Sequence, residues 1–203
     1  DLRTPLSRMQ LELEMLSDDK NDELIEGLRN DLAEIENLIS QTLVLAKDLK
    51  ATETSPVDIN ELLLSLVEDF RRSGSTVHFA PKHACLRHVR KDALKRVLTN
   101  VIDNAVAYSD GLPVNLECTC DGPDTTLKVI DHGPGIPPAE HKAVFQPFYR
   151  LESSRSKATG GSGLGLAIVH QLCRANGWNT EILPTTTGGT IFQIQLPFPG
   201  DQD

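Results

Sequence analysis

Apolar residues in the first fifty positions recur at alternating spacings of four and three. Two runs follow this rule, one beginning at Leu2 and one at Leu28, in a stretch with one proline, one glycine and no aromatic residue. A heptad of this kind places the apolar side chains on one stripe of a helix. Between the runs, residues 17–22 are polar and can cap helix ends. The pattern therefore predicts a helical hairpin.

A two-helix hairpin cannot enclose its own apolar stripe. Pairing with a second copy into a dimeric four-helix bundle would cover both stripes, so we expect a homodimer through residues 1–50. The alternative is that the hairpin folds back onto the rest of the same chain. We place the boundary of this predicted domain at residue 53, and a second domain over 54–203.

The pattern changes after Pro56, where short β-type runs begin to alternate irregularly with helical ones. The predicted strands cover residues 76–80, 114–120, 127–130, 180–183 and 190–196. The predicted helices cover residues 60–71, 92–108, 138–144 and 164–175. Neighbouring strands that are close in sequence suggest hairpins, and this order favours a mixed sheet with helices on one face. The predicted fold is an α+β two-layer sandwich.

Charge, hydropathy and cysteine spacing limit the partners of the chain. A net charge of −9 argues against nucleic acid or an anionic membrane surface. No apolar run approaches the roughly 20 residues that a membrane span needs. The cysteines have neither a CxxC spacing nor paired histidines, so we expect reduced thiols rather than zinc ligands at Cys85, Cys118, Cys120 and Cys173.

A glycine-rich segment directly precedes the last predicted helix. The stretch "GGSGLGLAIV" has four glycines within residues 160–165. Free amides and the helix dipole attract anions at a helix start, and glycines let a phosphate approach the backbone. The spacing is that of neither a dinucleotide fingerprint nor a P-loop. A phosphate site and a plain flexible loop both remain open from this segment alone.

Polar residues on a helix and at a strand end suggest further parts of a site. Asn100 and Asn104 lie one helical turn apart, and a single amide oxygen is a plausible ligand for a magnesium ion that keeps its waters. Asp131 ends a strand and is followed by Gly133 and Gly135, which would admit a flat ring beside the carboxylate. The alternatives are amides that face solvent and an ordinary turn.

The segment after "FQPFYR" is predicted to be a mobile lid over residues 151–159, because it is polar and carries Arg155 and Lys157. The later stretch "TTTGGT" is predicted to be a tight turn.

Taken together and in this order, the asparagine pair, "DHGPGI", "FQPFYR", "GGSGLGLAIV" and "TGGT" resemble the nucleotide-binding boxes of sensor histidine kinases. The beginning, "DLRTPLSR", resembles the helix that carries the phosphorylated histidine in that family.

The resemblance implies Mg-ATP as the nucleotide and the layered fold that these kinases share with DNA gyrase. It implies that Asn104 is the Mg²⁺ ligand, with Asn100 supporting the metal and phosphate site. Asp131 is implied to accept the adenine amino group, while Tyr108 lies against the base. Gly133 and Gly135 are implied to shape the base pocket. The residues implied to cradle the phosphates are Gly161, Gly163, Leu164 and Gly165. Arg150 and Arg155 are implied to be lid cations.

The sequence departs from the family pattern at two places. Ala107 stands where many relatives have a lysine or arginine, and the histidine that would precede the acidic residue of the first motif is absent because the sequence begins with Asp1. We expect the sequence to be a cytoplasmic fragment of a longer, inner-membrane-anchored protein, with the fragment starting one residue too late to include this histidine. Asp1 would then take or orient the histidine proton, and Thr4 would position water for dephosphorylation of a partner.

These implications predict a histidine kinase that passes phosphate to an aspartate of a response regulator and also acts as its phosphatase. A dimeric phosphatase or scaffold with weak kinase activity is the alternative, and Ala107 keeps it open.

Overall fold

A computed structural model describes residues 35, 53–120, 122, 124–151, 163–185 and 188–197. The chain divides into two compact units, residues 1–50 and 51–203, and the second is described below. Within the first unit only Ile35 is described, and it is helical. The predicted hairpin and its dimeric bundle therefore lie outside the described residues.

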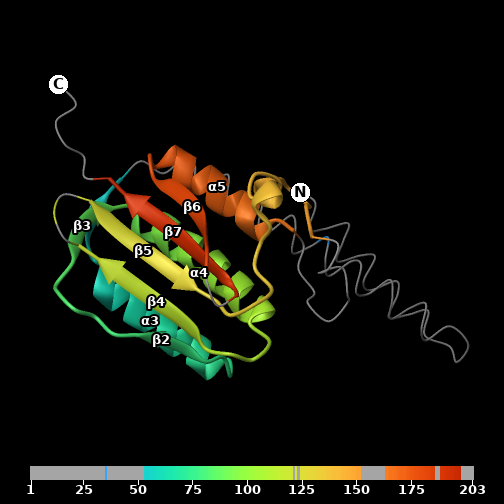
Figure 1. Cartoon of the computed structure of the whole chain (residues 1–203). Coiled ribbons are helices and arrows are strands. Elements are labelled where there is room, and N and C mark those ends of the chain that lie inside the picture. Colours follow the sequence, from blue (N-terminus) through green and yellow to red (C-terminus); the bar gives the residue numbers. More distant parts are fainter. Residues whose placement is uncertain are drawn as a thin grey trace, which may run out of the picture. The chain divides into compact units, whose positions relative to one another are not determined.

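The second unit is built on a five-stranded sheet with the strand order β2-β4-β5-β7-β6 (Figure 1). Strand β2 is parallel to β4, and every other neighbouring pair is antiparallel. Hairpins join β4 to β5 and β6 to β7, as the sequence predicts. The strands are β2 (Val77–Phe79), β4 (Val114–Thr119), β5 (Thr125–Ile130), β6 (Asn179–Pro184) and β7 (Thr190–Leu196).

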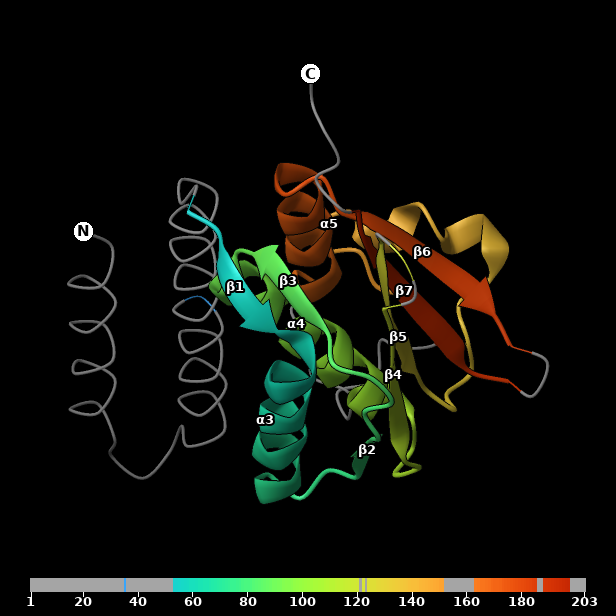
Figure 2. The same ribbon diagram turned by 90° about the vertical axis from the view of Figure 1, so that its left-hand side faces the viewer.

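Three helices cover one face of this sheet (Figure 2), namely α3 (Ile59–Arg72), α4 (Lys91–Tyr108) and α5 (Gly165–Ala175). Their apolar faces meet alternating apolar residues of the strands, and the core between the two layers includes fully buried Leu63, Leu94, Leu98, Ile102, Leu127, Leu172 and Ile194. Each such side chain contributes about 1.5–3 kcal/mol through its removal from water. The predicted α+β two-layer sandwich with a mixed sheet is confirmed.

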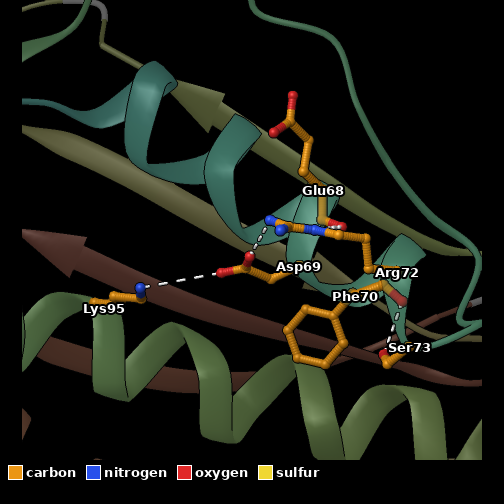
Figure 3. A network of polar contacts seen from close by, with 6 residues as sticks. All are labelled: Glu68, Asp69, Phe70, Arg72, Ser73 and Lys95. Carbon is orange, nitrogen blue, oxygen red and sulfur yellow. Dashed lines mark hydrogen bonds and ion pairs between the residues drawn. The ribbon is translucent and has the colours of Figure 1, made fainter.

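Polar contacts fix both ends of α3. At its start, the Asp58 carboxylate accepts hydrogen bonds from the backbone N–H groups of Asn60 and Glu61, at 2.9 and 3.4 Å. Near its end, Asp69 lies 2.6 Å from Arg72 and 4.0 Å from Lys95 of α4 (Figure 3). These ion pairs are exposed, so the buried faces rather than the charges hold α3 against α4.

A second, two-stranded sheet was not predicted. Strand β1 (Ser55–Asp58) pairs antiparallel with β3 (Leu86–Val89). Each strand of this ribbon has one buried residue, and Leu86 is 62% exposed. The ribbon's sequence therefore has little of the hydrophobic alternation by which strands are predicted. Pro56, interpreted as a break, lies in an edge strand that does not need its missing N–H.

Two other predictions need correction. The helix predicted over residues 138–144 is a pair of 3₁₀ turns, η1 (Pro138–Glu140) and η2 (Ala143–Phe145). The expectation of four reduced thiols is wrong for two of them, because Cys85 and Cys120 form a disulfide with a Cα–Cα distance of 5.9 Å. These residues are 35 positions apart in sequence, so no spacing rule could pair them. Among the described helices, none is long and apolar enough for a membrane span.

Candidate functional site

Asp131, directly after β5, is held by backbone groups of a residue close in sequence and of a distant one on β7. Its Oδ1 accepts hydrogen bonds from the N–H of Gly133 at 2.9 Å and of Thr190 at 3.1 Å. Its own N–H donates to the carbonyl of Thr190 at 3.0 Å. The residue is 8% exposed, and in the described part of the chain no group donates to Oδ2. The carboxylate therefore offers one oriented, unused acceptor.

Two glycines allow the backbone around Asp131 to pack closely. A Cβ on Gly133 would overlap the carbonyl oxygen of Tyr108, at the end of α4. Gly189 has a φ of +94°, and a Cβ there would overlap the Asp131 carbonyl oxygen and lie 2.9 Å from the Cα of His132. Gly135 is part of the same loop, with the carbonyl oxygen of Gly189 3.0 Å from the position of its Cβ. Larger residues would push these three segments apart.

The C-terminal half of α4 brings the predicted polar stripe to this loop. Asn100, Asn104 and Tyr108 are half-buried and spaced four apart, so they share one face of the helix. The Asn100 Nδ2 donates to the carbonyl of Arg96 at 2.9 Å, which leaves its Oδ1 available. At the other end of the stripe, the Ser109 hydroxyl oxygen accepts from the N–H of His132 at 3.4 Å.

The start of α5 lies beside the Asn100 end of the stripe. A Cβ on Gly165, the first residue of α5, would stand 3.4 Å from the Asn100 Oδ1. Leu164 occupies the N-cap position, and its side chain offers no acceptor to the first-turn amides. Such amides, with the helix dipole, favour an anionic group. The stripe on α4 thus connects the Asp131 loop to an anion-attracting helix start.

Residues 145–150, here called the aromatic segment, are anchored to the helix layer and the sheet. The Phe145 ring lies 5.4 Å from that of His170 on α5 and 6.0 Å from that of Phe192 on β7. In the same segment, the Tyr149 hydroxyl donates a hydrogen bond to the Glu140 carboxylate.

Gly163 packs against the same segment. It has a φ of +70°, its carbonyl accepts from the N–H of Phe148 at 3.0 Å, and its Cβ would lie 2.9 Å from the Phe148 carbonyl carbon. Gly163 thus has a packing reason to be glycine, besides the phosphate role that the resemblance implies.

The structure brings most of the predicted site residues into one region. Through the contacts above, Asp131, Gly133 and Gly135 adjoin the α4 stripe, and the stripe adjoins Gly165. Arg150 is half-buried at the end of the aromatic segment. The other predicted site residues lie outside the described residues: Asp1, Thr4, Arg155 and Gly161.

Sequence reasoning missed two residues that contact Asp131. Thr190 supplies an amide to the carboxylate, and Gly189 allows the close approach of β7 to the residues after β5. Both lie in "TTTGGT", which the sequence predicts as a tight turn and whose "TGGT" belongs to the family resemblance, but neither residue was given a role in the site. The double glycine was the available signal, because an ordinary tight turn rarely needs two.

Comparison with known proteins agrees with this arrangement. Residues 89–200, more than half of the chain, match the family described as "Histidine kinase-, DNA gyrase B-, and HSP90-like ATPase". The chain belongs to this ATPase family. The matched residues include α4, the Asp131 loop, the aromatic segment, α5 and both C-terminal strands.

Several relatives are sensor kinases. The chain is 34% identical to the sensor histidine kinase GtrS of Pseudomonas aeruginosa PAO1, with 97% of this chain and 40% of that protein covered. It is also 34% identical to the sensor protein RstB of Escherichia coli K12, with 97% and 46% covered. The chain therefore spans less than half the length of these relatives. The resemblance to sensor histidine kinases is confirmed.

A solved structure supports the same conclusion. Full-length ShkA in complex with AMPPNP has a TM-score of 0.70 and 27% sequence identity, with 97% of this chain and 44% of that chain covered.

Proposed function

We propose that residues 54–203 form the ATP-binding unit of a histidine kinase that transfers the γ-phosphoryl group of ATP to a histidine immediately preceding Asp1. In this proposal residues 1–53 form the dimerising hairpin. Phosphate then passes to an aspartate of a response regulator, and the same protein dephosphorylates that regulator with the help of Thr4. Family membership supports the ATP-binding part, and similarity to sensor kinases supports the transfer.

The observation that carries the proposal is the oriented, unused Oδ2 of Asp131. The adenine amino group is a donor, and an acceptor on a carboxylate that two backbone amides fix matches it without reorganisation. The absence of side chains at Gly133 and Gly189 keeps the surrounding loops compact. Tyr108 ends the stripe beside this loop and is proposed to lie against the base.

The α4 stripe and the start of α5 fit the phosphates and their metal. An amide oxygen is a ligand that Mg²⁺ accepts while it keeps waters and phosphate oxygens, so Asn104 would hold the ion with Asn100 in support. The ion supplies charge neutralisation on the phosphates. The amides of Gly161, Gly163, Leu164 and Gly165 are proposed to cradle the phosphates, with Arg150 and Arg155 as lid cations.

The acceptor chemistry is assigned to the first motif. A neutral imidazole is nucleophilic near pH 7, and a neighbouring carboxylate can orient or take its proton. Asp1 would have this role. The nitrogen attacks the γ-phosphorus, the bond to the bridging oxygen breaks, and ADP leaves.

Incubation with γ-labelled ATP and Mg²⁺ tests the function directly. Two proteins are compared, this chain and the same chain extended upstream through one histidine and the rest of its helix. Label on the extended chain only, lost in acid and stable in base, is expected for a phosphohistidine. Replacing that histidine with glutamine is the matched control and should remove the label.

One observation favours a second function. Ala107 is exposed on α4, at a position where the family resemblance implies a cation, so transition-state charge could be stabilised less well. A dimeric phosphatase or scaffold with weak kinase activity would bind Mg-ADP and leave the extended chain unlabelled. If Ala107 is the cause, Ala107→Lys should restore labelling; no gain would show that Ala107 is not what limits the kinase activity.

A further inference from the structure

Three of the four cysteines converge at one point of the second unit. The sulfur atoms of Cys85, Cys118 and Cys120 all lie within 4.8 Å of one another. Cys118 and Cys120 are two positions apart at the end of β4, while Cys85 directly precedes β3. We call these residues the three-cysteine cluster. None of its members belongs to the nucleotide site proposed above.

Two sulfur atoms of the cluster are already bonded. Cys85 and Cys120 form a disulfide, and their Cα–Cα distance of 5.9 Å is in the ordinary range for this bond. The third sulfur, of Cys118, lies 3.9 Å from that of Cys120. The Thr125 hydroxyl on β5 lies 3.5 Å from the Cys120 sulfur and 3.8 Å from the Cys85 sulfur. The cluster thus joins the residue before β3 to the β4–β5 hairpin, two segments that are distant in sequence.

The geometry favours Cys85 over Cys118 as the partner of Cys120. Residues two apart on an extended strand have Cα atoms separated by about 6.6 Å, near the upper limit for a disulfide. Cys118 is also fixed in the ladder opposite Leu127 of β5. Cys85 lies outside both sheets, where its position allows the bond without a break in strand pairing.

Cys118 is kept as an unreactive thiol. Burial raises its pKa to about 11, an effect that the Arg87 guanidinium opposes and the Asp58 carboxylate reinforces. Since the thiolate is the attacking form in disulfide exchange, little of Cys118 can attack the neighbouring bond near pH 7. Cys120 is more exposed than Cys85, which is 1% exposed, so an oxidant in solution reaches Cys120 first.

We propose that the three-cysteine cluster is a thiol redox site, in which a hydroperoxide reversibly joins Cys85 to Cys120 while Cys118 stays reduced. The Cys120 thiolate attacks the peroxide, the O–O bond breaks, and the products are a sulfenic acid and water or an alcohol. The Cys85 thiol then attacks that sulfur, and a second water leaves as the S–S bond forms. A dithiol reductant reverses the change by exchange and is itself oxidised.

The Cys85–Cys120 bond connects the β1–β3 ribbon and the start of α3 to the main sheet. The carbonyl of Cys85 accepts a hydrogen bond from the N–H of Ile59, the first residue of α3, at 2.8 Å. Cys120 lies at the β4–β5 hairpin, so the disulfide ties the β1–β3 ribbon and the start of α3 to the main sheet. Strand β1 is the first strand of the second unit. Oxidation is expected to raise the melting temperature by on the order of 10 °C, because it closes a long loop.

Thiol counting on the full chain tests the proposal. The chain is reduced, freed of reductant, treated with hydrogen peroxide, then unfolded and alkylated. Mass spectrometry should find four modified cysteines before peroxide and two after it, with peptides that carry Cys85 and Cys120 joined. Four modified cysteines after peroxide, or a mapped bond that involves Cys118, would overturn the proposal. Mapping the unmutated chain makes this result independent of whether any variant folds.

Variants and metals separate the alternatives. Cys118→Ser and the buried control Cys173→Ser should both keep the Cys85–Cys120 bond and the rise in melting temperature, whereas Cys120→Ser should lose both. Titration of the reduced chain with Cu(I) and with Zn²⁺ tests a metal site instead. Stoichiometric binding that is lost in Cys118→Ser would overturn the redox assignment, because the redox site does not use Cys118 as a partner.

Discussion

The two ends of the proposed nucleotide site are built in different ways. At the Asp131 end, one of the two amides that fix the carboxylate comes from a residue 59 positions away in sequence, and close backbone contacts at Gly133 and Gly189 leave no room for side chains. At the α4 end, Asn100 and Asn104 follow one another on a single helix and are only half-buried. The first end depends on tertiary packing, and the second depends mainly on local helical spacing.

This difference suggests a division of work. A base with a fixed pattern of donors and acceptors is matched by a fixed acceptor such as Asp131. A hydrated metal and a chain of phosphates can be held by side chains that retain some freedom, such as those on the α4 stripe. Substitutions at the Asp131 end should therefore cost stability and binding together, whereas those on α4 should cost binding alone.

The largest effect is expected from Gly189→Ala. The added Cβ would overlap the Asp131 carbonyl oxygen at a φ of +94°, so the β5–β7 junction must move. The free energy of unfolding in urea should fall by about 3 kcal/mol, and ADP binding should be lost. The matched control is Gly177→Ala, which has a φ of +68° and nothing within 4 Å of its Cβ, and which should cost about 1 kcal/mol. Equal losses would break the comparison.

A smaller and more selective effect is expected from Asn104→Ala. Removal of the proposed metal ligand should weaken ADP binding at least about tenfold in Mg²⁺. In EDTA the variant and the unmutated chain should bind ADP alike, and their unfolding midpoints should agree. Isothermal titration calorimetry in both buffers gives the result. A loss that persists in EDTA would place Asn104 in a structural role.

The smallest effect is expected from Gly165→Ala. Its Cβ would stand 3.4 Å from the Asn100 Oδ1, so the neighbour needs to shift by only a few tenths of an ångström. The stability change should stay within about 1 kcal/mol, since alanine is the better helix former. If phosphates lie against this helix start, ATP affinity should fall more than ADP affinity. An unchanged ratio of ATP affinity to ADP affinity would show that the phosphates do not lie against Gly165.

Sequence patterns predicted the elements whose side chains alternate between core and solvent. Strand β7 was predicted with the bounds that the structure has, and β2, β4, β5 and β6 were placed within two residues or so. The β1–β3 ribbon was missed because it has few buried side chains, and the Cys85–Cys120 bond was missed because it joins positions distant in sequence.

The same distinction applies to the site. The Asn100 and Asn104 pair could be found because helical spacing is a local property. The role of Asp131 was inferred from the family resemblance, but its two amide donors could not be, because Thr190 reaches it only through the pairing of β5 with β7. Gly189 belongs to the same non-local contact. Sequence therefore predicted which side chains to consider for the site, and tertiary packing determines how the Asp131 carboxylate is oriented.

The measurement that tests the central claim most directly is the nucleotide preference of Asp131→Asn. The two amides need an acceptor at Oδ1, so the new NH₂ group must take the place of Oδ2 and present a donor. The variant should lose most of its ADP affinity and prefer inosine diphosphate, whose base carries an acceptor oxygen in place of the amino group. Asp92→Asn, an exposed aspartate in the first turn of α4, should leave the preference unchanged. An Asp131→Asn protein that still prefers ADP as strongly as the unmutated chain would contradict the account.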